Sequence, residues 1–120
     1  MTEMVCFQGD RGTGKTSKLI GLADEHFSYI VVPDTQTVQM VAKKAKEEGR
    51  KIPFPVTYHE FTSGKFYGLG IKGGFVVDSV ECLLYYMARG VRVRAFSLDT
   101  SVVRVVNLDG RRQNYDVCPY

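Results

Sequence analysis

The chain has 120 residues, of which 44% are apolar and 24% are charged, and its formal net charge is +3. This length supports one hydrophobic core, and the composition is that of a globular protein rather than of a disordered or collagen-like chain. The positive charge is mild and no dense Lys/Arg cluster is present, which argues against tight autonomous DNA binding.

The cysteine pattern is typical of a reducing compartment, and the hydropathy pattern predicts neither a membrane span nor a secretory signal. Cys6, Cys82 and Cys118 are widely spaced and odd in number, which fits neither a disulfide framework nor a metal-binding spacing. No apolar run reaches the length needed to span a bilayer, and no secretory signal precedes the first apolar run. We therefore expect a cytoplasmic protein without a membrane partner.

Apolar patterns in the first half of the chain predict strands alternating with helices. The second strand is stopped by Pro33. Thr35 is the expected N-cap of the helix that follows, and Gly49 ends that helix. The predicted elements are a strand over 3–8, a helix over 14–26, a strand over 27–32, a helix over 35–48 and a short strand over 56–58.

The second half begins with a loop over 59–73 that contains a short helical turn. The later elements are a strand over 74–78, a helix over 79–89 with Val80, Leu83, Leu84 and Met87 on its inner face, a strand over 91–97, and strands over 102–108 and 111–117. Asp109-Gly110 between the last two strands is a hairpin signal. The alternation predicts a single α/β domain over 1–120, with a mainly parallel sheet covered on both faces and an antiparallel C-terminal β-hairpin at its edge.

A phosphate-loop pattern, G-x-x-x-x-G-K-[ST], is matched by residues 9–16 between a predicted strand and a predicted helix. The glycines permit a backbone in which successive N–H groups turn toward phosphate oxygens, and the following helix directs its positive end to the same place. Lys15 is expected to reach the β- and γ-phosphates of ATP, and the Thr16 hydroxyl to hold Mg²⁺. The expected nucleotide-binding residues are Gly9, Asp10, Arg11, Gly12, Thr13, Gly14, Lys15, Thr16 and Ser17.

A phosphate loop also requires an acid that orders Mg²⁺ through water, expected at the end of an apolar strand beside the loop strand. Asp78 follows the apolar run 75–77 and fits this role, which makes Thr16 and Asp78 the predicted metal ligands. Asp78 also begins a predicted helix, so an N-cap is the alternative role, and the two roles are compatible.

The order of these features resembles the first motor domain of superfamily 1 helicases and related ATPases of the additional-strand class. Residues 9–16 resemble the first motif of that family, 30–35 its next strand and turn, and 75–78 its Mg²⁺ motif. Residues 56–61 are similar to the segment T-F-H-S-F, which those helicases place near the DNA strand, and 95–99 lie where a γ-phosphate-sensing strand would come. The resemblance implies a three-layer, RecA-like P-loop NTPase fold. The chain is also similar to the small phosphate-loop proteins that bacteriophages encode.

The resemblance covers residues 3–100 and departs from the family at the position that activates water. The family has a glutamate directly after the Mg²⁺ aspartate, whereas this chain has Ser79, which is not a general base at neutral pH without a partner. Glu81 lies one helical turn farther on and is the predicted base. Lys15 is the other predicted catalytic residue. A solvated first-turn glutamate is the alternative role for Glu81.

Several side chains outside these motifs have two interpretations. Arg89, Arg92 and Arg94 either serve the γ-phosphate of a neighbouring subunit or are solvated partners of acids. His59 either contacts nucleic acid or is a plain loop histidine. The aromatics at 54, 58, 61, 66 and 67 either stack on bases, with lysines between them, or form a satellite core under a long loop.

The sequence therefore predicts a Mg·ATP-binding, ATPase-like protein of DNA metabolism, phage-encoded and slow to hydrolyse ATP. Its expected partners are the nucleotide, single-stranded DNA or a DNA-processing protein, and a second copy of the chain. One alternative is a non-catalytic protein in which ATP orders a partner surface, favoured by the serine at position 79. Another is a small-molecule or nucleoside kinase, which the absence of arginine from residues 59–73 disfavours.

Overall fold

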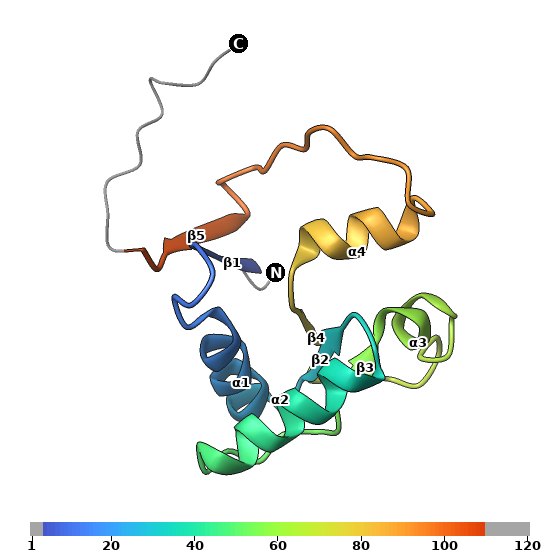
Figure 1. The fold of residues 1–120 in the computed structure, drawn as a ribbon. Coiled ribbons are helices and arrows are strands. Elements are labelled where there is room, and N and C mark those ends of the chain that lie inside the picture. The colour runs from blue at the N-terminus through green and yellow to red at the C-terminus, as the bar shows by residue number, and fades with distance from the viewer. Residues whose placement is uncertain (1–3, 110–120) are drawn as a thin grey trace. The chain divides into compact units, whose positions relative to one another are not determined.

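In the computed structural model of the chain, residues 4–109 are described (Figure 1). The protein is an α/β protein with short parallel strands and two compact units, one formed by residues up to Lys15 and from Leu98 onward, the other by Thr16–Ser97. The described elements, in chain order, are β1 (Met4–Gln8), α1 (Lys15–His26), β2 (Tyr29–Val32), α2 (Thr35–Glu47), β3 (Val56–Thr57), α3 (Tyr58–Thr62), β4 (Phe75–Val77), α4 (Val80–Met87) and β5 (Val103–Asn107).

The sheet of the Thr16–Ser97 unit has the strand order β3-β2-β4, and all three strands are parallel. The central strand β2 places Val31 opposite Val56 on one side and opposite Val77 on the other. The strands are parallel because helix α2 returns the chain before β3, and helix α3 with its following loop returns it before β4. All three carboxyl ends therefore lie at one edge of the sheet.

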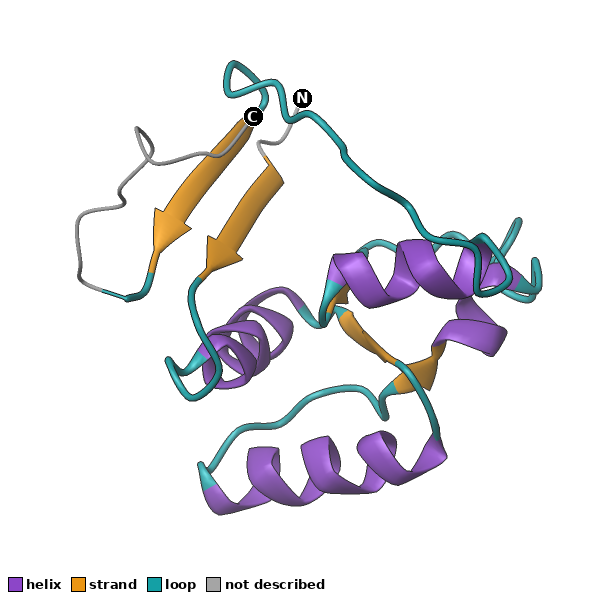
Figure 2. Ribbon diagram, turned by 45° about the horizontal axis from the view of Figure 1, so that its top comes forward, coloured by secondary structure: helices purple, strands orange, loops and turns teal. Residues whose placement is uncertain are grey.

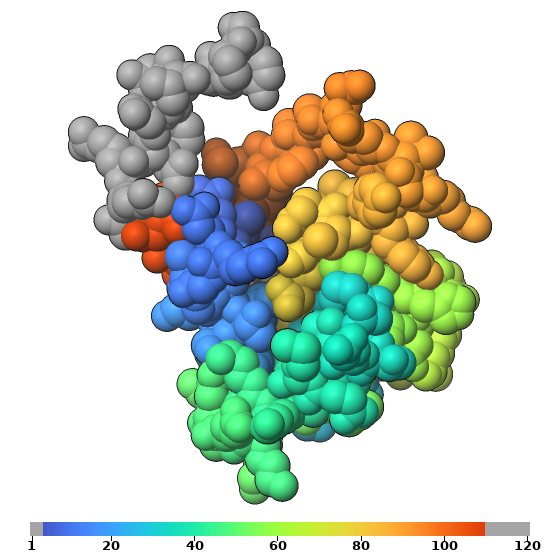
Figure 3. Space-filling view, in the orientation of Figure 1, coloured from blue at the N-terminus to red at the C-terminus, as the bar shows by residue number. Residues whose placement is uncertain are grey.

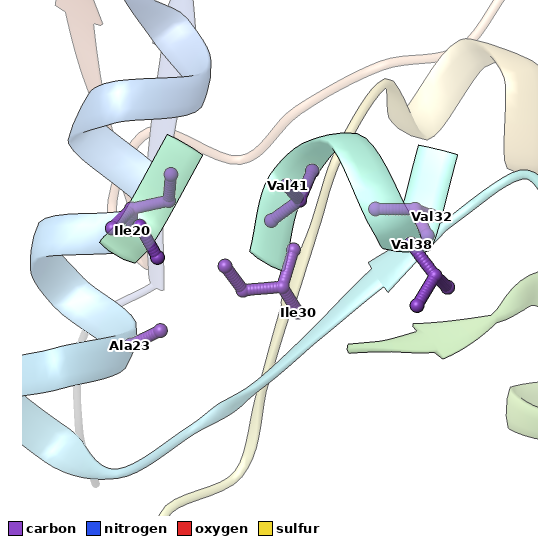
Figure 4. Close-up of a cluster of buried hydrophobic side chains, with 7 residues drawn as sticks. Ile20, Ala23, Ile30, Val32, Val38 and Val41 are labelled. Carbon is purple, nitrogen blue, oxygen red and sulfur yellow. The ribbon is translucent and has the colours of Figure 1, made fainter. Parts of the chain in front are cut away.

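Helices cover both faces of this sheet, as the sequence predicts. Side chains alternate along β2, so Ile30 and Val32 face α1 and α2, whereas Tyr29 and Val31 face α3 and α4. Figure 4 shows the buried cluster that β2 forms with α1 and α2. Its buried members are Ile20, Ala23, Ile30, Val32, Val38, Val41 and Ala45. Burial of these apolar side chains is the main favourable term holding the layers together.

The other unit is built on the pair β1 and β5, which lie side by side in Figure 2. The two strands are parallel and pair Met4 with Val103 through to Gln8 with Asn107. The strand predicted over 102–108 is thus confirmed, but the prediction of antiparallel pairing at the edge is wrong for it. The long segment between the two strands brings the chain back to the end of β1 where β1 begins, so β5 runs in the same direction as β1. The predicted second arm of the hairpin, over 111–117, lies outside the described residues.

Two predicted element boundaries are wrong for local reasons. The N-cap of α2 is Asp34 rather than Thr35, because the Asp34 side chain accepts the Thr37 backbone N–H at 2.8 Å. Tyr58, predicted as strand, begins α3 because Thr57 and Glu60 form a capping box directly before it. Both corrections move a helix start to a side chain that can satisfy a free backbone N–H.

The predicted strand over 91–97 has no strand structure among the described residues. Its alternating valines and arginines are exposed, and a strand requires a neighbour that accepts its backbone hydrogen bonds. The predicted inner face of α4 is also only partly buried, because Leu83 is 6% exposed while Val80 and Met87 are 47% and 58% exposed. Figure 3 shows α4 and the segment after it, in yellow and orange, at the surface.

Candidate functional site

The loop between β1 and α1 has the backbone that its glycines require. Gly12 and Gly14 have φ values of 83° and 88°, which residues with a Cβ atom rarely adopt. A Cβ atom on Gly9 would lie 2.7 Å from Thr13 Oγ1, so Gly9 allows the loop to double back on itself. The loop therefore depends on glycine for its backbone conformation at positions 12 and 14 and for close packing at position 9.

Lys15 folds its side chain across this loop. Its ammonium donates hydrogen bonds to the carbonyl oxygens of Gly9 at 2.6 Å and Asp10 at 2.7 Å. The Thr13 hydroxyl donates to the same Asp10 carbonyl at 2.7 Å. An ammonium at the mouth of a tight loop provides a positive charge, and phosphate oxygens form stronger charge-assisted hydrogen bonds than neutral carbonyls do. The remaining predicted binding residues of this stretch, Arg11 among them, are exposed or partly exposed.

Asp109 is part of this loop region, and sequence reasoning assigned it only to a hairpin turn. Its carboxylate accepts the backbone N–H of Asp10 at 2.9 Å, and its own N–H donates to the Asn107 side chain at 3.0 Å. Because β1 and β5 are parallel, their carboxyl ends meet at one edge and bring Asp109 beside the loop. The sequence carries a signal for this role, since Asp109 directly follows the strand predicted over 102–108, as Asp78 follows the apolar run 75–77.

The first turn of α1 carries Thr16 and Ser17. The Ser17 hydroxyl donates to Glu48 Oε2 at 2.7 Å, which lowers the pKa of Glu48, with smaller contributions from Lys44 and Arg50. Ser17 thus joins α1 to the end of α2. Thr16 is partly buried in the same turn.

Asp78 directly follows β4, and its backbone N–H donates to the Val31 carbonyl at 2.9 Å. β4 pairs with β2, and the described partner of β1 is β5, so the expected direct pairing of the loop strand with the Asp78 strand is not found in the described part of the chain. The N-cap of α4 is Ser79, not Asp78, so the alternative role of Asp78 as an N-cap is wrong. Glu81 lies exposed in the first turn of α4.

Tyr58 connects α3 to the turn after Asp78. Its hydroxyl donates to the carbonyl oxygens of Asp78 at 2.6 Å and Ser79 at 3.0 Å. Burial raises the pKa of the Tyr58 hydroxyl above its ordinary value, and the neighbouring Cys82, Asp78 and Glu81 raise it further. The hydroxyl therefore stays protonated and acts as a donor.

Most of the aromatic side chains of residues 54–67 belong to a core. Phe61 and Phe66 pack on Phe75 with ring centroids 5.0 Å and 5.3 Å apart. This arrangement supports the satellite-core interpretation for these residues. Tyr67 and Phe54 remain outside it and are 82% and 64% exposed.

His59 lies beside the aromatic core on the exposed side of α3. Its Nδ1 atom is 3.3 Å from the Tyr86 hydroxyl, so the ring joins α3 to α4. The arginines at 89, 92 and 94 are exposed.

The donor set of the predicted metal site is a hydroxyl from Thr16 and a carboxylate from Asp78. Oxygen ligands suit Mg²⁺, which is commonly held by one or two carboxylates together with substrate phosphates and water. Within residues 4–109, no group of three or more His, Cys, Asp or Glu side chains could hold a metal ion by itself. Thr16 and Asp78 therefore offer the kind of oxygen donor that Mg²⁺ prefers.

No family model matches the chain, and neither a curated protein nor a solved structure shows significant similarity to it. Among the described residues, no helix is both long enough and apolar enough to cross a membrane.

Proposed function

We propose that this chain is a Mg·ATP-binding P-loop protein of the RecA-like, additional-strand type, with slow ATPase activity in DNA metabolism. The observation that carries the proposal is the loop over residues 9–15. It combines the full phosphate-loop pattern, two left-handed glycines and a lysine folded across the loop between a strand and a helix. A glycine-rich turn without a phosphate ligand has no structural requirement for both the full motif and the lysine.

Each predicted residue has a separate task in the proposed site. Lys15 and the loop N–H groups bind phosphate oxygens, and Lys15 neutralises charge on the transferred group. Thr16 and Asp78 hold Mg²⁺, which supplies charge neutralisation at the phosphates when it is bound. Asp109 orders the start of the loop by accepting the Asp10 N–H. Single-stranded DNA and a second copy of the chain are the proposed macromolecular partners.

Slow hydrolysis follows from the residue after Asp78. Ser79 has no side-chain capping hydrogen bond and is not a base at neutral pH. Glu81, exposed in the first turn of α4, is the proposed base. The same observation favours the alternative function, a nucleotide-responsive binding protein that holds ATP without turnover.

The test is ATP affinity and phosphate release, each measured with and without single-stranded DNA. Lys15→Ala is expected to weaken Mg·ATP binding by about tenfold or more, because it removes a charged hydrogen-bond donor. Lys18→Ala is the matched control, since Lys18 is an exposed lysine on the same helix. Equal affinity in wild type and Lys15→Ala would refute the proposal. Tight binding without release would favour the nucleotide-responsive protein over the ATPase.

A further inference from the structure

The residue after Asp78 has a backbone conformation that side chains seldom adopt. Ser79 has φ 63° and ψ 74°, in the left-handed region where the Cβ atom crowds the following carbonyl oxygen. Ser79 is also the N-cap of α4, yet its side chain makes no capping hydrogen bond. Its conformation is therefore maintained by contacts that other residues make.

The Tyr58 hydroxyl contacts both sides of this turn, and the Ser79 carbonyl oxygen also accepts the backbone N–H groups of Cys82 at 2.9 Å and Leu83 at 3.1 Å. The hydroxyl lies 2.6 Å from the Asp78 carbonyl oxygen and 3.0 Å from the Ser79 carbonyl oxygen, which share its proton. These oxygens belong to the peptide units on either side of the Ser79 Cα atom. Because each peptide unit is planar, one hydroxyl restrains both backbone dihedral angles of Ser79.

Tyr58 is itself held in place. Its side chain is buried, with 2% of the residue exposed, and its ring centroid lies 5.8 Å from that of Tyr86. The capping box before it fixes the first turn of α3, because the Thr57 hydroxyl accepts the Glu60 N–H and Glu60 accepts the Thr57 N–H. The hydroxyl therefore reaches the turn from a buried ring on a capped helix rather than from a loop.

We propose that Tyr58 is a positioning residue for the metal-binding acid Asp78. The Tyr58 hydroxyl holds Ser79 in the left-handed conformation and so sets the direction of the backbone at Asp78, where the chain leaves β4. This inference rests on the proposed nucleotide site and deepens it. The T-F-H-S-F segment, to which residues 56–61 are similar, has phenylalanine where this chain has Tyr58. The hydroxyl is therefore a property of this chain and not of that pattern.

The first measurement is made on the nucleotide-free protein. Tyr58→Phe removes the hydroxyl and keeps the ring. Tyr86→Phe is the matched control, because it removes the neighbouring hydroxyl, which contacts His59 instead of the turn. The Cα and Cβ chemical shifts of Ser79 report its backbone conformation. We expect them to leave the left-handed range in Tyr58→Phe and to stay unchanged in Tyr86→Phe.

The second measurement is the dependence of ATP affinity on Mg²⁺. In Tyr58→Phe, the Mg²⁺ concentration that gives half of the maximal increase in affinity is expected to rise about three- to tenfold, as the loss of one hydrogen bond predicts. Affinity in EDTA should not change, because the phosphate loop is intact. In a Ser79→Gly background the effect of Tyr58→Phe should shrink, since glycine adopts the left-handed conformation without support.

The outcomes separate this inference from the proposed function. Unchanged Ser79 shifts in Tyr58→Phe would overturn the inference, as would equal losses in Tyr58→Phe and Tyr86→Phe. Weaker ATP binding in EDTA as well as in Mg²⁺ would also overturn it, because that pattern indicates general destabilisation. If wild type binds no Mg·ATP while the Ser79 shifts move as expected, the proposed function is refuted and Tyr58 keeps its role only in the turn.

Discussion

At the scale of single residues, acidic side chains set where the helices begin. Asp34 accepts hydrogen bonds from the backbone N–H and the hydroxyl of Thr37, both at 2.8 Å, and these bonds lower the pKa of Asp34. In α3 the N-cap is Thr57, and Glu60 completes its capping box from the third helical position, where the Thr57 N–H and Lys65 lower the pKa of Glu60. Both helices follow the carboxyl end of a strand, so these acids decide where the chain turns away from the sheet.

The cap of α2 gives a direct prediction. Asp34→Ala is expected to lower the free energy of unfolding, because it leaves a helix N–H without its acceptor. Thr35→Ala should change it by less than half as much, since Thr35 lies inside the first turn. Urea denaturation of both variants checks this. A larger decrease in the free energy of unfolding for Thr35→Ala than for Asp34→Ala would indicate that Thr35 is the N-cap.

At the scale of elements, α1 is positioned by its contacts with β2 and α2. Ile20 and Ala23 are fully buried in the cluster that also contains Ile30. Two polar contacts lie at the margins of this packing, one between Ser17 and Glu48 and one between Arg50 and Asp24 at 3.4 Å. The first of them lies in the turn that directly follows the phosphate loop, so the packing of α1 bears on the proposed site.

The contact between Ser17 and Glu48 predicts a dependence of stability on pH. The pKa of Glu48 is lowered from its ordinary value of 4.5, chiefly by the Ser17 hydroxyl, so the folded state favours the ionised form. Its contribution is therefore present above pH 4.5 and is lost as the pH falls through the lowered value. Glu48→Gln should be less stable than wild type at pH 7, and the difference should shrink toward pH 3.

Urea midpoints at several pH values measure this difference. Glu47→Gln is the control, because Glu47 is the exposed residue next to Glu48 at the end of α2. A gap between wild type and Glu48→Gln that does not change with pH would contradict the prediction. Ser17→Ala should reproduce part of the effect, since it removes the main donor to the carboxylate.

At the scale of the whole molecule, the parallel pair β1 and β5 joins segments from the two ends of the described chain. Each residue of β1 from Met4 to Gln8 has a partner in β5. Such a pairing closes a long stretch of chain, which costs conformational entropy that only the completed fold offsets. The pairing also places Asp109 at the phosphate loop, so one long-range contact completes the loop region.

A cross-link tests this register. Cys6 lies opposite Val105, and neighbouring strands are about 4.8 Å apart, which is within the range of Cα separations that a disulfide spans. Val105→Cys is expected to form a disulfide with Cys6 on oxidation, whereas Val106→Cys, on the opposite face, should not. Peptide mapping by mass spectrometry identifies the linked pair and separates it from links to other cysteines. Linkage at 106 instead of 105 would contradict the register.

Particular residues show how much could be predicted from the sequence. The boundaries of α1 and α2 agree with their apolar periodicity to within about a residue, because a helix that buries one face must repeat that face. The alternation of Ile30, Val31 and Val32 across two covered faces follows from the same logic. The strand over 91–97 could not be judged in this way, because its pattern says nothing about which neighbour would pair with it.

The sequence by itself determined the α/β class, the phosphate-loop pattern and the position of Asp78 after a strand, because these depend on local periodicity and on fixed spacing along the chain. Only the tertiary structure decided that Asp109 reaches the loop, that Ser17 is bound to Glu48 and that Tyr58 spans the turn at Ser79. Each of these contacts joins residues far apart in the chain, and which distant residues meet is a consequence of strand order and helix packing rather than of any local pattern.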